Sequence, residues 1–352
     1  MLRPAGERDQ DGHRHRRRLP AGHPGARYRR PRDHPGGSLT TTGRPAAAGR
    51  KLAINRLRER GPVEPAALDR FLARHEVPIV EGARCTFLYR GEASAVHLVH
   101  QIFGLPQRIP LRRLRGTDLW YVVLELPDGS RVEYQLEIAR GEQHERINDP
   151  LNPHVAHSPL GSSSVCYAHG HEVPEWTQPD PESRPGSLAE LTVPSRALRR
   201  SARVTLYLPA RFRRNARYPL LIVHDGGDYL RYAAAQTVLD NLIHRLDVAE
   251  TIAAFVYPGD RLTEYANSAA HARYLTAELV PQLEAEFPLA GTPSSRCLMG
   301  ASFGAVAALS AAYRYPGVYG SLLLQSGSFV FTDIGQNHGG PAFEPVVRFI
   351  NR

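Results

Sequence analysis

The stretch Arg296-Cys-Leu-Met-Gly-Ala-Ser-Phe-Gly-Ala-Val-Ala-Ala-Leu309 decides the fold of this chain. An apolar run typical of a buried strand breaks at Gly300 and continues as a run of small residues typical of a packed helix. The pattern Gly300-x-Ser302-x-Gly304 predicts a sharp strand-to-helix turn that projects the Ser302 hydroxyl above a sheet. Unpaired backbone N–H groups at the start of the helix would lie beside that hydroxyl. An ordinary strand–helix junction with a capping serine is the alternative interpretation.

The segment 196–352 alternates between strand-like and helix-like patterns on both sides of this turn. Strands are expected over 203–208, 218–223, 251–257 and 321–325, and helices over 233–246, 268–287 and 303–315. Several of these strands are continuous apolar runs, which are typical of strands buried on both faces. The pattern predicts an α/β fold with a doubly wound, mostly parallel sheet and Ser302 at the carboxyl end of a strand.

The segment 79–175 has a different pattern, with short alternating runs rich in β-branched and aromatic residues. Such runs predict a small β-sandwich domain of immunoglobulin-like type, in which Pro127-Asp-Gly-Ser130 forms a hairpin turn. Residues 51–78 predict a short helical segment, and the proline-rich residues 176–195 predict a linker. Four histidines near residues 154–171 lack metal-ligand spacing and are interpreted as loop histidines.

The net charge of +9 is concentrated in residues 1–50, which hold twelve arginines and four acidic residues. This segment is rich in Pro and Gly and poor in large aliphatic residues, so it is predicted to be a disordered tail or sequence upstream of the true start. No specific nucleic-acid partner is therefore expected. The chain has no apolar run long enough for a membrane span or a signal peptide, and its three cysteines are odd in number and widely spaced. A cytoplasmic protein with buried thiols is expected.

Several motifs together resemble one family. They are Gly116-Thr-Asp-Leu-Trp-Tyr, Asp149-Pro-Leu-Asn-Pro, His224-Asp-Gly-Gly-Asp-Tyr, Asp260-Arg-Leu-Thr-Glu-Tyr, Gly300-Ala-Ser-Phe-Gly and Gln325-Ser-Gly-Ser. The chain from about Thr86 resembles the enterochelin (ferric enterobactin) esterase-like family, in the esterase D group of α/β-hydrolases. This resemblance implies an immunoglobulin-like domain before a hydrolase domain, and hydrolysis of a small-molecule ester.

The resemblance also implies roles for individual residues. Ser302 would be the acyl nucleophile, and the Phe303 backbone N–H would be one oxyanion donor. The loop after the strand 218–223 would supply the second donor, from Gly227 or Asp228; a plain turn with flexible glycines is the alternative. Arg261 and Glu264 match an Arg-x-x-Glu motif at the rim of the cleft, where they would form an ion pair. Without a binding role, they would be a surface pair of small energetic value.

A serine nucleophile needs a histidine base and a carboxylate that orients it, in the chain order Ser, acid, His. The only candidates after Ser302 are Asp333, Glu344 and His338. All three come earlier in the chain than the resemblance implies, so the hydrolase sheet is expected to be C-terminally incomplete. Either His338 and Asp333 act as substitute base and acid, or His338 is an ordinary loop histidine.

Three functions fit these observations. The first is a serine esterase of the enterochelin esterase type, cleaving ester or lactone bonds, with a catecholate siderophore as a candidate substrate. The second is a binding remnant without a complete triad, and the third is a carboxylesterase for acylated sugars. None of these requires a cofactor, and the sequence has no phosphate loop and no metal-ligand spacing.

Overall fold

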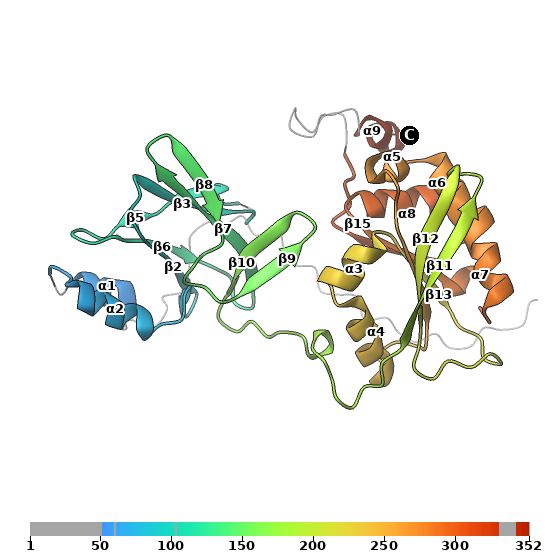
Figure 1. The fold of residues 1–352 in the computed structure, drawn as a ribbon, viewed down its shortest axis with the longest axis horizontal. Helices are drawn as coiled ribbons and strands as arrows, with labels where there is room; N and C mark the ends of the chain where they lie inside the picture. Colours follow the sequence, from blue (N-terminus) through green and yellow to red (C-terminus); the bar gives the residue numbers. More distant parts are fainter. Residues whose placement is uncertain (1–50, 60, 103, 331–342, 352) are drawn as a thin grey trace, which may run out of the picture. The chain divides into compact units, whose positions relative to one another are not determined.

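The computed structural model describes residues 51–59, 61–102, 104–330 and 343–351 (Figure 1). The predicted tail over 1–50 lies outside these residues. Within the described ranges, no helix has the length and apolar character that crossing a membrane would require.

Residues 79–167 form two antiparallel sheets, here called the β-sandwich segment. The first sheet has the order β1 (Ile79–Glu81), β2 (Arg84–Arg90), β6 (Leu119–Glu125) and β5 (Arg112–Arg113). The second has the order β4 (Arg108–Pro110), β3 (Ala95–His100), β7 (Arg131–Arg140), β10 (Gly161–Tyr167) and β9 (Val155–Ser158), and β8 (Gln143–Ile147) pairs with β7. Side chains of both sheets meet in one buried cluster, with Phe87 and Trp120 from the first and Leu98 and Tyr134 from the second. The immunoglobulin-like assignment of this segment stays a prediction.

Two short helices cover the outer face of the first sheet. They are α1 (Ala53–Arg58) and α2 (Pro65–Ala73). Ile54 and Leu68 of these helices are buried in one cluster with Leu88 and Leu119 of the sheet. Successive side chains of a strand point to opposite faces, so Leu88 contacts the helices whereas its neighbour Phe87 contacts the second sheet.

The predicted hairpin at Pro127-Asp-Gly-Ser130 is wrong, because β6 and β7 belong to different sheets. The turn itself is present: Ser130 N–H donates to the carbonyl of Pro127, and Gly129 has a φ of +75°. Gly129 N–H, however, donates to the carbonyl of His169 at 2.7 Å, so this turn is anchored at the end of β10. The turn therefore carries the chain from one layer to the other.

A third sheet lies in residues 187–325 and has a mixed strand order. Strands β11 (Ser187–Ser195), β12 (Arg200–Leu208) and β14 (Ile252–Val256) are antiparallel neighbours, and β13 (Leu220–Val223), β15 (Arg296–Ala301) and β16 (Ser321–Gln325) follow β14 as parallel neighbours. The parallel strands lie in the sheet in the order β14-β13-β15-β16, so the connections between them are crossovers, which helices supply. The parallel part agrees with the sequence analysis, and the two antiparallel pairings are additional.

Helices cover both faces of this sheet (Figure 1). On one face, Val223 and Phe255 pack against α3 (Gly226–Tyr232) and α4 (Ala235–His244). On the other face, Ile222 and Ala254 pack against α6 (Ala269–Arg273), a π-helical turn (Tyr274–Leu279), α7 (Val280–Glu286) and α8 (Phe303–Arg314). Adjacent residues of each strand thus enter different cores, which explains the continuous apolar runs in the sequence.

The predicted linker 176–195 is wrong in its second half, where β11 occupies Ser187–Ser195. This strand pairs with β12 along its full length and lies at the edge of the sheet. Most of its side chains are exposed, and it contains Pro194, which an edge strand tolerates because one side of it needs no ladder hydrogen bonds. Because most of its side chains are exposed and it contains a proline, such a strand does not stand out as an apolar run in the sequence.

A buried hydrogen-bond network surrounds Asp149 in the β-sandwich segment. Tyr134 Oη donates to Asp149 Oδ2 at 2.7 Å, and Leu151 N–H donates to Asp149 Oδ1 at 2.9 Å. Asn152 Nδ2 donates to Tyr134 Oη and to the carbonyl of Val165. Burial raises the pKa of Asp149 to about 6, although the hydrogen bond from Tyr134 acts in the opposite direction. The Asp149-Pro-Leu-Asn-Pro motif therefore orders this loop from within.

The raised pKa of Asp149 gives the folded state a higher proton affinity than the unfolded state between about pH 4 and 6. Relative to an Asp149→Asn variant, the wild-type chain should lose about 2 to 3 kcal/mol of unfolding free energy as the pH rises through this window. The unfolding free energy falls with rising pH because the folded state binds the Asp149 proton more tightly than the unfolded state. This contribution is complete only at pH values where Asp149 is protonated in both states. Urea denaturation of both proteins at half-unit pH intervals measures the difference. Parallel curves would contradict the assignment.

Candidate active site

Ser302 occupies the turn between β15 and α8. Its backbone angles are φ 55° and ψ −120°, a conformation that costs a non-glycine residue about 1 to 3 kcal/mol. Two backbone hydrogen bonds hold it there: Ser302 N–H donates to the carbonyl of Gln325 at 3.0 Å, and Ser328 N–H donates to the carbonyl of Ser302 at 3.2 Å. The sharp turn expected from the sequence is thus fixed by the neighbouring chain that leaves β16.

The two glycines of the motif allow a close approach of chain segments. A Cβ atom at Gly300 would lie 2.4 Å from the carbonyl carbon of Gly304, closer than real Cβ atoms come to other atoms. A Cβ atom at Gly304 would lie 3.2 Å from Asp225 Oδ2 and from His224 Cβ. The first turn of α8 therefore lies directly against the loop that follows β13.

That loop enters α3 through Asp225, which has a left-handed φ of 54°. Of the two predicted second oxyanion donors, Asp228 already donates its N–H to the carbonyl of Asp225 at 2.9 Å. Gly227 lies in the first turn of α3, where N–H groups have no partner within the helix. Phe303 is the first residue of α8 and has the same property. Of the two predicted donors, Asp228 is therefore the less suitable, because its N–H is already engaged.

Asp225 is held by a bidentate ion pair with Arg261, the first residue of α5 (Arg261–Tyr265). Arg261 Nε and Nη2 donate to Asp225 Oδ1 and Oδ2 at 2.7 and 2.8 Å. The Asp225 N–H donates to Tyr265 Oη at 3.1 Å, and the Asp225 side chain is only 8% exposed. The hydrogen bonds to Asp225 raise the pKa of Arg261 further above its ordinary value. Arg261 therefore clamps the loop that carries Gly227.

Glu264 does not pair with Arg261, so the predicted ion pair between these two residues is wrong. Glu264 accepts hydrogen bonds from Arg200 Nε and Nη2 at 2.9 and 2.7 Å, and from the N–H of Gly259 at 3.1 Å. Both residues come from α5, but each binds a different partner. Arg200 stands at the start of β12, and no feature of the sequence indicated this pairing.

The side chain of Ser302 contacts a residue that the sequence analysis did not single out. Ser302 Oγ and Ser328 Oγ are 2.9 Å apart and share a hydrogen bond. Ser328 belongs to the Gln325-Ser-Gly-Ser motif, which carried part of the family resemblance. That motif was therefore the available signal for this residue.

Two buried histidines lie beneath the turn, and neither is hydrogen-bonded to Ser302 in the described structure. His224 Nδ1 is 2.9 Å from the carbonyl of Met299, and the His224 and His271 ring centroids are 5.3 Å apart. Burial, together with the neighbouring His271, lowers the pKa of His224 to about 3. Burial also lowers the pKa of His271, whose Nδ1 is 3.7 Å from Glu264 Oε2. Both rings are neutral at physiological pH.

The predicted base and acid, His338 and Asp333, lie outside the described residues. Glu344, the other acidic candidate, begins α9 (Glu344–Ile350) and forms an ion pair with Arg348 one turn later. In the described structure, the turn with Ser302 and Phe303 thus adjoins the Asp225 loop, which precedes Gly227 and is held by Arg261.

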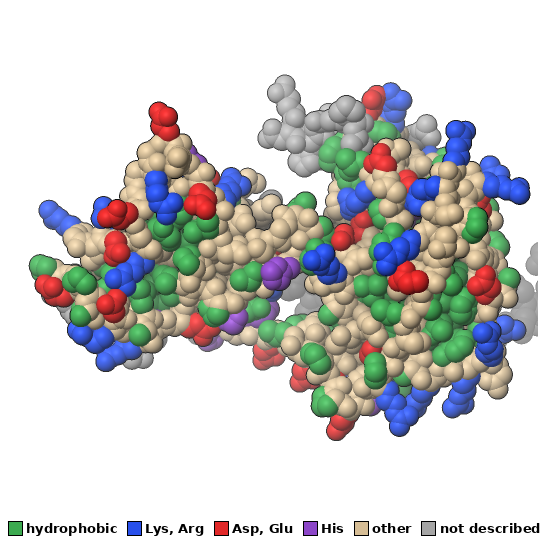
Figure 2. Space-filling model, viewed as in Figure 1, with side chains coloured by type: hydrophobic (Ala, Val, Ile, Leu, Met, Phe, Trp, Pro, Cys, Tyr) green, Lys and Arg blue, Asp and Glu red, His purple; other side chains and the backbone are tan. Residues whose placement is uncertain are grey.

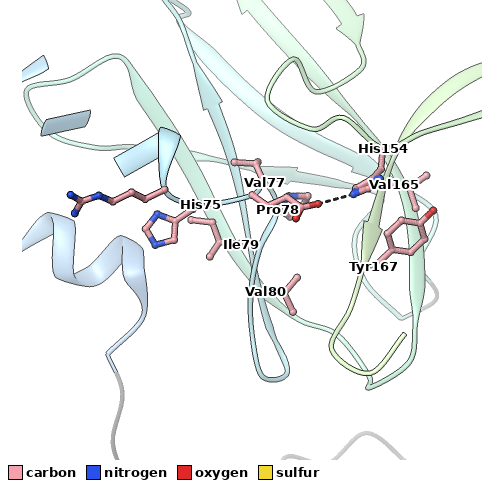
Figure 3. Close-up of a pocket in the computed structure, with 10 residues that line it drawn as sticks. His75, Val77, Pro78, Ile79, Val80, His154, Val165 and Tyr167 are labelled. Atoms are coloured by element: carbon pink, nitrogen blue, oxygen red, sulfur yellow. Dashed lines mark hydrogen bonds and ion pairs between the residues drawn. The ribbon is translucent and has the colours of Figure 1, made fainter. Parts of the chain in front are cut away.

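The histidines of the β-sandwich segment do not form a metal site in the described part of the chain. His154 Nε2 is 2.7 Å from Glu76 Oε1, and its ring lies edge-on to Tyr167. These residues line a cavity of about 450 Å³ together with apolar side chains such as Val77 and Ile79 (Figure 3). Of the predicted catalytic residues, Ser302 is the one that the structure describes, and it does not line this cavity. On the face drawn in Figure 2, basic and acidic side chains are interspersed over the described residues.

Part of the chain matches a family of known proteins. Residues 195–340 match the family model described as "Putative esterase". The chain is 28% identical over 149 residues to the uncharacterized protein YjcH of Bacillus subtilis, covering 40% of this chain and 62% of that protein. It is 25% identical over 259 residues to the iron(III) enterobactin esterase of Escherichia coli O6:H1, covering 66% of this chain and 64% of that protein. The chain thus spans slightly less than two thirds of the length of these relatives.

Solved structures agree on the fold. The enterobactin esterase from Shigella flexneri, crystallised in the presence of enterobactin, superposes with a TM-score of 0.59 at 23% identity, covering 70% of this chain and 71% of that one. The mixed sheet and these matches show that this chain shares the fold of esterases, and the family match falls on the part that carries Ser302. Over about two thirds of its length, the chain is similar to iron(III) enterobactin esterases.

The close approach at Gly300 predicts a steep cost for any side chain at this position. Gly300→Ala should lower the unfolding free energy by at least about 3 kcal/mol, because the new methyl group overlaps the Gly304 backbone. Gly317→Ala is the matched control: Gly317 has a φ of +79°, but no atom lies within 4 Å of the position that its Cβ would take, so only about 1 to 2 kcal/mol is expected. Urea denaturation measures both, and equal losses would contradict the close approach.

The ion pair between Arg261 and the buried Asp225 should contribute more to the unfolding free energy than a surface ion pair does. Arg261→Gln should cost about 2 to 4 kcal/mol of unfolding free energy, because it leaves the buried Asp225 carboxylate without its cation. Arg84→Gln breaks an exposed pair with Glu125 and should cost less than about 1 kcal/mol. The double variant Asp225→Asn/Arg261→Gln should recover part of the loss. Additive losses in that double-mutant cycle would show that the pair is not coupled.

Proposed function

We propose that this chain is a serine carboxyl-ester hydrolase of the enterochelin esterase type that acts through an acyl-enzyme on Ser302. The single observation that carries the proposal is the conformation of Ser302, with φ 55° at the junction of β15 and α8. A non-glycine residue is kept in such a conformation only where the surrounding structure enforces it, and such residues cluster at active sites.

In this proposal, the backbone amides supply the main electrostatic stabilisation. Attack of Ser302 Oγ on an ester carbonyl places negative charge on the carbonyl oxygen. The N–H groups of Phe303 and Gly227 would donate to that oxygen. In support, Phe303 begins α8, and Gly227 lies in the first turn of α3, just after the Asp225 loop that Gly304 approaches. The fixed amide dipoles need no reorganisation during the reaction, which is why such donors are effective.

For the base and the acid we propose His338 and Asp333, the nearest such residues that follow Ser302 in the chain. The described histidines beneath the turn, His224 and His271, are poor alternatives because they are buried and His224 is engaged with a carbonyl. A non-catalytic binding protein is the second candidate function. The hydrogen bond of Ser302 Oγ to Ser328 Oγ favours it, since a poised nucleophile would instead donate to a histidine.

The proposed substrate is a small-molecule ester or lactone, with a catecholate siderophore ester as the first candidate. The support is the similarity of this chain to iron(III) enterobactin esterases. An acylated sugar is the competing substrate class, because related folds act on many esters.

The proposal predicts that a fluorophosphonate probe labels the full chain at Ser302. Labelling should be lost in Ser302→Ala, because the probe reacts only with an activated serine hydroxyl. It should fall by about a hundredfold or more in His338→Ala if this histidine is the base. Intact-mass spectrometry measures the adduct, and turnover of p-nitrophenyl, catecholate and acyl-sugar esters then separates the substrate classes.

Matched variants separate the possible outcomes. Ser328→Ala removes the hydrogen-bond partner of Ser302 and should leave the probe adduct in place. Labelling of Ser302 that persists in His338→Ala would disprove the proposed base but not the nucleophile. A correctly folded chain that never reacts with the probe would instead support the binding function.

A further inference from the structure

The two sheets of the β-sandwich segment each place a cysteine in their shared core. Cys85 belongs to β2 of the first sheet, and Cys166 belongs to β10 of the second sheet. Both side chains are fully buried, with 0% of their surface exposed, and both belong to the same hydrophobic cluster. The third cysteine, Cys297, lies in β15 and is partly exposed.

The strand registers bring these two cysteines to neighbouring positions across the core. The rings of Phe87 and Tyr134 contact each other across the two sheets, with centroids 4.8 Å apart. Cys85 is two residues before Phe87 and so lies on the same face of β2. Cys166 is paired with Val132, which is two residues before Tyr134 on the same face of β7. Cys85 and Cys166 therefore lie close to the contact between Phe87 and Tyr134, in the core between the two sheets.

The side chains of Cys85 and Cys166 interact directly. A hydrogen bond from the Cys166 thiol lowers the pKa of Cys85, although burial opposes this shift. The same hydrogen bond and burial raise the pKa of Cys166.

We propose that Cys85 and Cys166 form a latent disulfide site that can link the two sheets of the β-sandwich segment. This inference does not depend on the proposed esterase activity. The competing explanation is that both thiols act only as small apolar side chains that fill the core.

The proposed oxidant is a small-molecule disulfide such as glutathione disulfide. The Cys85 thiolate attacks one sulfur of the oxidant, which forms a mixed disulfide and releases one glutathione thiolate. The Cys166 thiol then loses its proton to water and attacks the Cys85 sulfur, which forms the Cys85–Cys166 bond and releases the second glutathione. The two protein thiols lose two electrons in total, and the oxidant gains them.

Burial of the two thiols determines when this reaction occurs, and the number of residues between them determines its effect on stability. In the folded state the thiols are inaccessible to glutathione, so the bond would form while the sheets are apart, during folding or opening. Once formed, it would close a loop of roughly 80 residues, and a loop of that length strongly restricts the unfolded chain. The bond should therefore raise the thermal midpoint of the β-sandwich segment.

The test uses the full chain in a Cys297→Ala background, so that no other intramolecular pair is possible. The reduced chain is refolded in glutathione buffers of increasing oxidised fraction, then alkylated and analysed by peptide mass spectrometry. The same series of glutathione buffers in concentrated urea gives the oxidant ratio at which the unfolded chain is half oxidised. The folded chain should be half oxidised at an oxidant ratio at least about tenfold lower than the unfolded chain. The oxidised protein should also melt about 5 °C or more above the reduced protein.

A Cys166→Ala variant of the same background is the matched control, and it should form only a mixed disulfide with glutathione. Circular dichroism of each reduced protein establishes that it has folded. If the folded chain requires the same or a higher oxidant ratio than the unfolded chain, the native geometry does not favour the bond and the proposal is overturned. A folded chain that yields only mixed disulfides would overturn it equally.

Discussion

The close approach of Gly300 to the Gly304 backbone is the constraint on which the rest of the candidate site depends. It lets α8 begin immediately at the end of β15, which forces Ser302 into its strained conformation. It also places the first turn of α8 against the Asp225 loop of the neighbouring strand. A larger residue at either glycine would separate these segments.

An ion pair and hydrogen bonds then fix the position of the Asp225 loop. Asp225 has a left-handed backbone and a nearly buried carboxylate, and neither feature is favourable by itself. Arg261 neutralises the carboxylate, Tyr265 accepts the Asp225 N–H, and the Asp225 carbonyl accepts from Asp228. Because every polar group of Asp225 has a partner, the loop has one defined position. Helix α5 thus determines where the Gly227 amide lies, although neither Arg261 nor Tyr265 need touch a substrate.

The sequence predicted those parts of the structure that local patterns determine. The Gly300–Gly304 turn and the helices around it follow from nearby residues, as does the parallel part of the third sheet. The sequence did not predict which segments pair at a distance. The turn at 127–130 was recognised, but its local chemistry does not say whether the flanking strands share a sheet. Likewise, the sequence indicated Arg261 and Glu264 as an ion pair, but their partners come from other elements of the chain.

Burial is the main reason why the pKa of both histidines beneath the turn is lowered, and the two ion pairs assist it. Arg261 balances Asp225 and Arg200 balances Glu264, so the carboxylates next to His224 and His271 are already compensated. A proton on either ring would add an uncompensated charge in a buried environment, and the pKa of both rings is accordingly lowered. In the proposed reaction, the backbone amides of Phe303 and Gly227 would then be the main groups that stabilise an oxyanion at Ser302.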